Sequence, residues 1–98
     1  MEAPAGRVER LMTLSEAEFI RSIAALLPPG SAVENGCAVA TLGTGRVTIT
    51  YEPLTSLRLG QSLVLPRARV VLAFGQTTAA EREAFLARFD LAFQRGGG

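Results

Sequence analysis

Few side chains in this sequence are of the kinds that perform catalysis. The chain has no histidine and no lysine, so it lacks the commonest general base and the amine that forms Schiff bases. Cys37 and Tyr51 remain, together with nine carboxylates. Cys37 has no basic residue beside it in the sequence that would activate its thiol. We therefore predict that the protein is not an enzyme.

The carboxylates also have structural explanations. Four of them fall in the first turns of two predicted helices, where acidic side chains stabilise the positive end of the helix dipole: Glu16, Glu18, Glu81 and Glu83. A zinc site needs a cluster of cysteine and histidine, and this chain has a single cysteine. The sequence therefore predicts no metal and no cofactor.

The tripeptide Gly43-Thr44-Gly45 begins like a dinucleotide-binding loop. Thr48 stands where the third glycine of that loop would be, and a strand pattern follows it instead of a helix. The tripeptide is therefore interpreted as a hairpin turn.

Composition and charge limit the class of protein. We expect one domain over residues 1–98, and the net charge of +1 gives no whole-chain reason to bind nucleic acid. All ten basic residues are arginine, which is typical of a GC-rich genome, so we expect a bacterial protein. A single cysteine suits a reducing cytoplasm, and no apolar run approaches the ~20 residues of a membrane span. We therefore predict a cytoplasmic protein that does not contact membranes.

Two amphipathic helices are predicted from capping and periodicity. Ser15 with Glu18, and Thr78 with Glu81, have the spacing of a capping box, in which each side chain satisfies the other residue's free backbone N–H. Apolar residues at helical spacing follow each cap: Phe19, Ile20, Ile23, Leu26 and Leu27 after the first, and Phe85, Leu86, Phe89 and Phe93 after the second. Pro28-Pro29-Gly30 is expected to end the first helix.

Three strands are predicted between the helices, at residues 37–42, 46–52 and 63–74. Residues 53–61 are expected to form a loop, either irregular throughout or with a brief extended piece at Leu57 to Leu59. Alternation in the longest strand puts Arg67 and Arg69 on one side and Val70 and Leu72 on the other. Leu63 and Leu65 have the parity of the arginines. We prefer a bulge near Pro66 that returns the leucines to the buried side; the alternative is that they contact something else.

The predicted fold is an α+β two-layer sandwich in the order α-β-β-β-α. Hairpin-length connections favour an antiparallel sheet of three strands, or of four if a short hairpin forms around Asn35-Gly36. Both helices are expected to lie on one face of the sheet. Residues 1–13 are expected to form a flexible lead-in and residues 96–98 a flexible tail.

This arrangement leaves one sheet face exposed, and we predict that this face or a strand edge binds a partner protein. A small sheet has open edges, and pairing them across a two-fold axis would give a homodimer; the partner is thus a second copy or another protein. The partner-binding residues predicted by alternation are Arg46, Thr48, Thr50, Arg67, Arg69 and Val71.

Two other functions stay open. Arg46, Arg67 and Arg69 could bind an anion or nucleic acid by contacting phosphates, although the face has no aromatic residues on which bases could stack. Alternatively, a small apolar ligand could lie between the helices and the sheet, lined by Phe19, Tyr51, Phe85 and Phe89.

Overall fold

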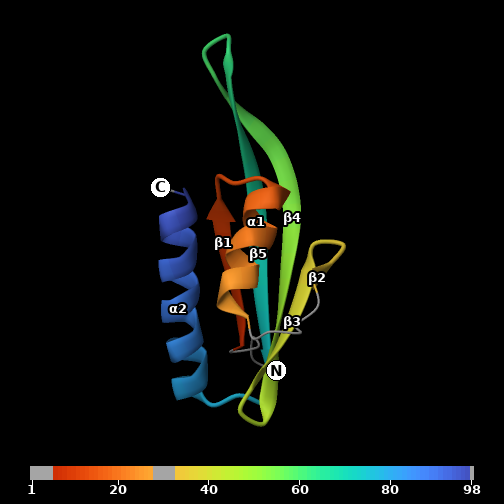
Figure 1. The fold of residues 1–98 in the computed structure, drawn as a ribbon, viewed down its shortest axis with the longest axis vertical. Helices are drawn as coiled ribbons and strands as arrows, with labels where there is room; N and C mark the ends of the chain where they lie inside the picture. Colours follow the sequence, from red (N-terminus) through yellow and green to blue (C-terminus); the bar gives the residue numbers. More distant parts are fainter. Residues whose placement is uncertain (1–5, 28–32, 98) are drawn as a thin grey trace.

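The chain folds into two helices and one antiparallel sheet of five strands. A computed structural model describes residues 6–27 and 33–97. The sheet has the strand order β1-β5-β4-β3-β2 (Figure 1). The α+β class is therefore confirmed, whereas the predicted count of three or four strands is wrong. The elements are β1 (Arg7–Met12), α1 (Glu16–Leu26), β2 (Val33–Glu34), β3 (Cys37–Leu42), β4 (Gly45–Leu59), β5 (Leu63–Gly75) and α2 (Ala79–Gly97).

Strand β1 forms from residues that we expected to be a flexible lead-in. It pairs antiparallel with β5, with Met12 opposite Ala68. Val8 and Met12 pack against the core, and Arg10, which shares their side of the strand, bonds to Asp90 of α2 through two nitrogens, each at 3.2 Å. The inward arginine spoils the simple apolar-polar alternation that identifies strands in a sequence.

Both predicted capping boxes are present. The Ser15 hydroxyl accepts a hydrogen bond from the Glu18 backbone N–H at 3.2 Å, and the Glu18 carboxylate accepts one from the Ser15 N–H at 2.8 Å. Thr78 and Glu81 form the same pair of bonds at 3.1 and 2.9 Å. The residues expected to end α1, at 28–30, lie outside the described residues, and α2 continues to Gly97, into the expected tail.

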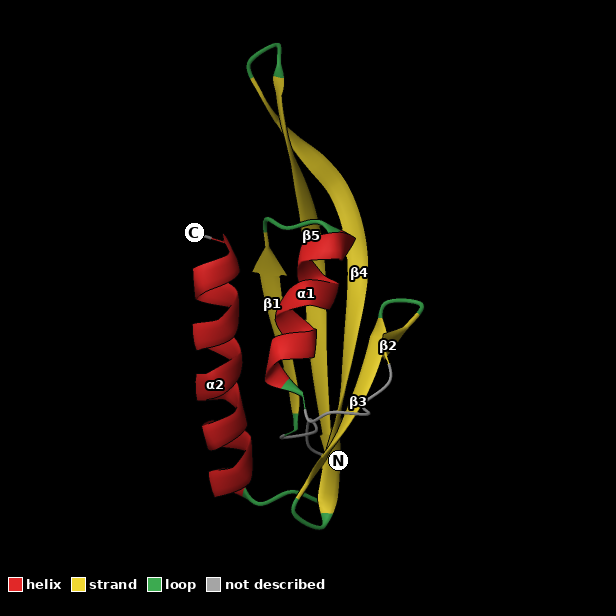
Figure 2. Cartoon of the chain, viewed as in Figure 1, coloured by secondary structure: helices red, strands yellow, loops and turns green. Residues whose placement is uncertain are grey.

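The helices differ from the expected arrangement in detail. Helix α1 lies across β4 and β5, whereas α2 runs alongside α1 towards the β1 side of the sheet (Figure 2). Their inward side chains share one core with one side of the sheet, which we call the helix side; the other side is the open face. Fully buried members of this core are Phe19, Ile23, Val47, Ile49, Val70, Leu72 and Phe89.

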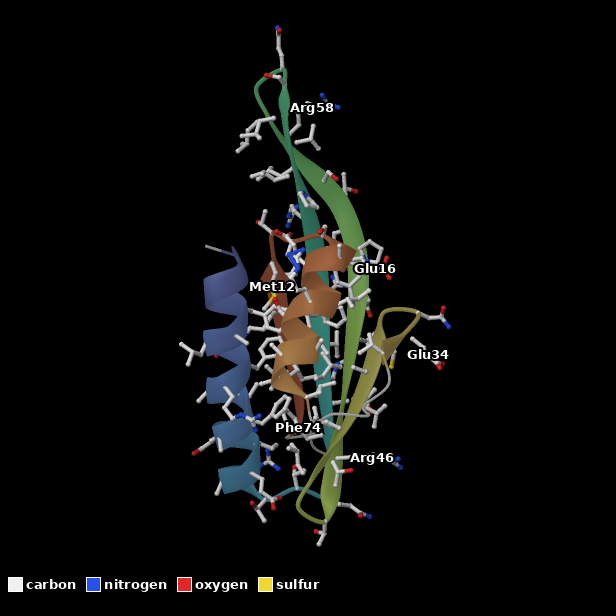
Figure 3. All side chains as sticks on the ribbon, in the orientation of Figure 1. Met12, Glu16, Glu34, Arg46, Arg58 and Phe74 are labelled. Atoms are coloured by element: carbon white, nitrogen blue, oxygen red, sulfur yellow. The ribbon has the colours of Figure 1, made fainter. Side chains whose placement is uncertain are left out.

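Strands β4 and β5 run on past the helices as a long hairpin. We expected residues 53–61 to form a loop, but β4 continues to Leu59, and a short turn connects it to β5. We call residues 55–66 the arm. The arm extends well beyond both helices along the 49 Å long axis of the molecule, with Arg58 near its tip (Figures 1 and 3).

Two prolines at the base of the arm explain why the strands are not broken. The Tyr51 N–H donates to Gly36, on the β3 side of β4, so by alternation the nitrogen of Pro53 points the same way. Pairing with β3 ends at Thr50, and Pro53 therefore loses no bond. The same holds for Pro66 on β5. The Phe74 N–H donates to Gly6 on the β1 side, so by alternation the nitrogen of Pro66 also points to that side, and pairing with β1 ends at Ala68.

The bulge that we expected near Pro66 lies on the neighbouring strand. Leu54 is opposite Arg67 and Leu57 is opposite Leu65, so β4 has one extra residue between these pairs and β5 has none. Alternation along β5 therefore continues without a shift. Leu63 and Leu65 share the open face with Arg67 rather than returning to the helix side.

Candidate interaction surface

The open face consists of cross-strand rows that change character along the hairpin. In the body of the sheet, Thr48 is opposite Ala73, Thr50 is opposite Val71 and Glu52 is opposite Arg69. In the arm, the rows consist of leucine pairs. The open face thus has a polar body and an apolar end.

Charges in the polar body largely neutralise one another. Arg69 lies 3.0 Å from Glu52 and 3.7 Å from Glu9, and Arg7 lies 3.2 Å from Glu9. The side chains in these pairs are 40–51% exposed, so each pair contributes little to stability, within about 0–1 kcal/mol. Their main consequence is that the Arg69 charge is already compensated within the chain.

The three arginines proposed to bind an anion do not converge. Arg46 is opposite Gly75, at one end of the open face, whereas Arg67 lies eight residues earlier on β5. At ~3.3 Å per residue the two positions are about 26 Å apart along the strands. Arg69 lies between them and is paired with carboxylates. The geometry therefore gives no support to a common phosphate site.

The six residues predicted to bind a partner share the open face by alternation, but they differ in accessibility. Val71 is only 5% exposed, because it lies in the middle of the sheet between its cross-strand neighbours Glu9 and Thr50. Arg46 is exposed, and Thr48 and Thr50 are half-buried. The body therefore offers a mainly polar contact surface, and the apolar contribution expected from Val71 is small.

The paired apolar residues of the open face lie on the arm, whereas the body exposes only single apolar side chains on this face, Leu11 and Val39. Leu57 pairs with Leu65, and Leu59 pairs with Leu63; we call these four residues the leucine face. Leu57, Leu59 and Leu63 are 41%, 46% and 49% exposed. The arm that carries them extends past both helices (Figure 2). Arg58 and Val64, which form the intervening pair, point to the other side of the arm.

The two outer strands are poorly suited to pairing with another strand. Strand β2 has only two residues. Strand β1 carries Arg7 and Glu9 on its open-face side and Arg10 on its helix side. Short edge strands and charged edge residues are the devices that prevent edge-to-edge association. Of the two predicted routes to a partner, the open face therefore fits the geometry better than a strand edge.

The aromatic residues proposed to line a ligand pocket pack against one another. The rings of Phe19 and Tyr51 have centroids 5.2 Å apart, and those of Phe89 and Phe93 are 4.3 Å apart. The Tyr51 hydroxyl donates to the Leu14 carbonyl at 3.2 Å. Burial, and then the charges of two nearby glutamates, raise the pKa of Tyr51 above its ordinary value. These rings behave as core rather than as a binding site.

A groove between the helices is the main hollow away from the open face among those described. It has a volume of about 510 Å³ and is lined by Arg21, Leu26, Arg88 and Leu91, among others. Arg88 donates a hydrogen bond to the Leu26 carbonyl at 3.1 Å, which satisfies a free acceptor at the end of α1. Arg88, one of the two arginines that line this groove, thus already has a structural role.

The described residues contain no group of three or more His, Cys, Asp or Glu placed to hold a metal ion. Within residues 6–27 and 33–97, neither helix combines the length and hydropathy that crossing a membrane requires. No protein-family model matches the chain, and no curated protein or solved structure matches it either. Any functional assignment therefore rests on the surface itself.

Proposed function

We propose that this protein is a non-catalytic association domain that binds a partner protein through its open face, with the leucine face as the anchor. One observation supports this most strongly: two adjacent cross-strand leucine pairs lie on a ribbon that no other part of the described chain covers. An isolated two-stranded hairpin is at best marginally stable in water. Contiguous exposed apolar residues at the end of a sheet are typical of an interaction site.

The rest of the open face would serve as the rim of this contact. Interfaces commonly have an apolar centre surrounded by polar residues that exclude water and fix orientation. Arg46, Thr48 and Thr50 can fill this role because they are accessible and lie on the same side as the leucines. Homodimerisation through paired edges remains a prediction, but the blunted outer strands do not favour it.

In-cell photo-crosslinking tests the proposal. A photoreactive residue at Leu63 should give adducts because it lies within the leucine face, and one at Thr48 should give fewer. The same residue at Glu83, which is exposed on α2, is the control and should give none. Equal adduct yields at Leu63 and Glu83 would contradict an interaction site on the arm.

A further inference from the structure

We infer that the partner segment bound by the arm is an amphipathic helix of another protein, with an apolar stripe on the leucine face and a carboxylate against Arg67. This inference rests on the proposed function, because it specifies the chemistry of the partner at the same surface. Charge and the packing mode of the body support it.

The charge of the arm is uncompensated. No aspartate or glutamate occurs from Pro53 to Ala80. Among the described residues, Arg67 has no ion pair and no side-chain hydrogen bond, in contrast to Arg69. Arg67 is on the leucine side of the hairpin and follows the Leu57–Leu65 pair directly, opposite Leu54. A guanidinium beside an apolar patch is complementary to a partner that has an acidic residue next to its apolar residues.

The same features disfavour a second copy as the occupant. Two arms stacked face to face would place an Arg67 guanidinium from each chain at the contact, although neither chain has an aspartate or glutamate from Pro53 to Ala80 to pair with it. A partner with its own carboxylates avoids this repulsion.

The body of the protein shows how a helix packs on these two strands. Helix α1 covers β4 and β5 with Phe19, Ile23 and Leu26, which have the spacing i, i+4, i+7. The leucine face offers a similar two-strand platform on the opposite side of the sheet. The leucine pair farthest from Arg67 is Leu59 with Leu63. Leu63 lies four residues from Arg67 along β5, which is about 13 Å at ~3.3 Å per residue. At 1.5 Å per helical residue, the partner's carboxylate would lie about nine positions from its most distant apolar residue.

Two designed peptides test this chemistry directly. One is a helical peptide of about 18 residues with leucines at i, i+4, i+7 and glutamates on both flanks of the stripe; its twin has lysine for each glutamate. Fluorescence anisotropy with the full chain should show at least about tenfold tighter binding of the glutamate peptide at ~50 mM salt, and a smaller preference at ~500 mM.

Matched variants locate the contact. Arg67→Gln should weaken binding of the glutamate peptide about fivefold, whereas Arg58→Gln, which removes the same charge from the other side of the arm, should change it less than about twofold. The double variant Leu59→Ser/Leu63→Ser should lose both peptides. Circular dichroism and thermal unfolding show whether each variant retains the fold.

Four results would overturn the inference: equal affinities for the two peptides, no binding of either, equal effects of the two arginine variants, or a wild-type dimer that Leu59→Ser/Leu63→Ser dissociates in sedimentation. The proposed function fails separately. It is lost if crosslinks at Leu63 are absent, whereas crosslinks at Leu63 combined with equal peptide affinities refute only the acidic helix.

Discussion

The body and the arm are built from the same two strands, yet their apolar sides are opposite. In the body, the helix side carries Ile49 and Leu72, both fully buried, and the open face carries threonines and ion pairs. In the arm, the open face carries four leucines, of which Leu57, Leu59 and Leu63 are 41–49% exposed, and the other side carries Arg58 and a single exposed apolar residue, Val64. The sheet thus changes its apolar side where its own helices end, which is what a second cover on the other side would require.

The contrast in burial arises from which elements pack over each residue and not from the type of residue. Leu72 and Leu63 are the same residue type on the same strand, and they are 0% and 49% exposed. Leu72 belongs to the core beneath the helices, whereas Leu63 lies outside it, opposite Leu59 on the arm. A leucine on this hairpin therefore contributes to folding or to binding according to what lies above it.

The largest expected effect comes from truncating these two leucines in parallel. Leu72→Ala should lower the free energy of unfolding by about 2–5 kcal/mol, because it leaves a cavity in a packed core. Leu63→Ala should lower it by less than about 0.5 kcal/mol, as expected for an exposed side chain. Urea denaturation measures both values. Similar losses would mean that the arm folds as part of the core, and the contrast between the two regions would no longer hold.

An intermediate effect is expected at Tyr51, the last aromatic residue of the body before the arm. Tyr51→Phe keeps the ring against Phe19 but removes the hydrogen bond to Leu14, so it should cost about 1 kcal/mol at neutral pH.

The pH dependence of Tyr51→Phe gives a sharper test. Burial, and then Glu16 and Glu18, raise the pKa of the folded tyrosine above its ordinary value of 10.0. The stabilisation is therefore complete below about pH 10 and is lost as the pH rises through the folded pKa. The stability gap between wild type and variant should shrink in that range, because the two proteins differ only in the hydroxyl of the single tyrosine. A gap that stays constant in alkaline unfolding experiments would show that the hydroxyl is not buried as described.

The smallest expected effect on stability comes from removing the arm. Leu54 and Arg67 are directly opposite, so residues 55–66 can be replaced by Asn-Gly, which favours a two-residue hairpin turn. The free energy of unfolding should change by less than about 0.5 kcal/mol, while binding of the glutamate peptide should be lost. A loss of more than about 2 kcal/mol in urea denaturation would show that the body needs the arm to fold.

Local patterns in the sequence predict the helices well. Ser15 with Glu18, and Thr78 with Glu81, mark both helix starts because capping depends on residues three positions apart. Asn35-Gly36 adopts the positive φ angles of a tight turn, and the strands on either side of it pair, which is one of the two alternatives that the sequence left open. The polar open face of the body likewise follows from simple alternation.

The arm and β1 could not be predicted in the same way because they depend on what lies beside them. Pro53 and Pro66 indicated breaks, yet each is harmless where the neighbouring strand has ended, and that position is set by tertiary pairing. Arg10 hid β1 because its partner, Asp90, lies 80 residues away. The sequence did contain an indication of the leucine face: Leu63 and Leu65 share the parity of Arg67, the alternative that we considered less favourable.

The connection between β1 and the last helix has a consequence for synthesis. Strand β1 is translated before its neighbour β5 and before Asp90, its ionic partner on α2. At ~5–20 residues per second, the 80 residues between Arg10 and Asp90 take about 4–16 s to make. Strand β1 therefore stays unpaired during translation until β5 has been made, and the contact of Arg10 with Asp90 can form only after most of α2 has followed.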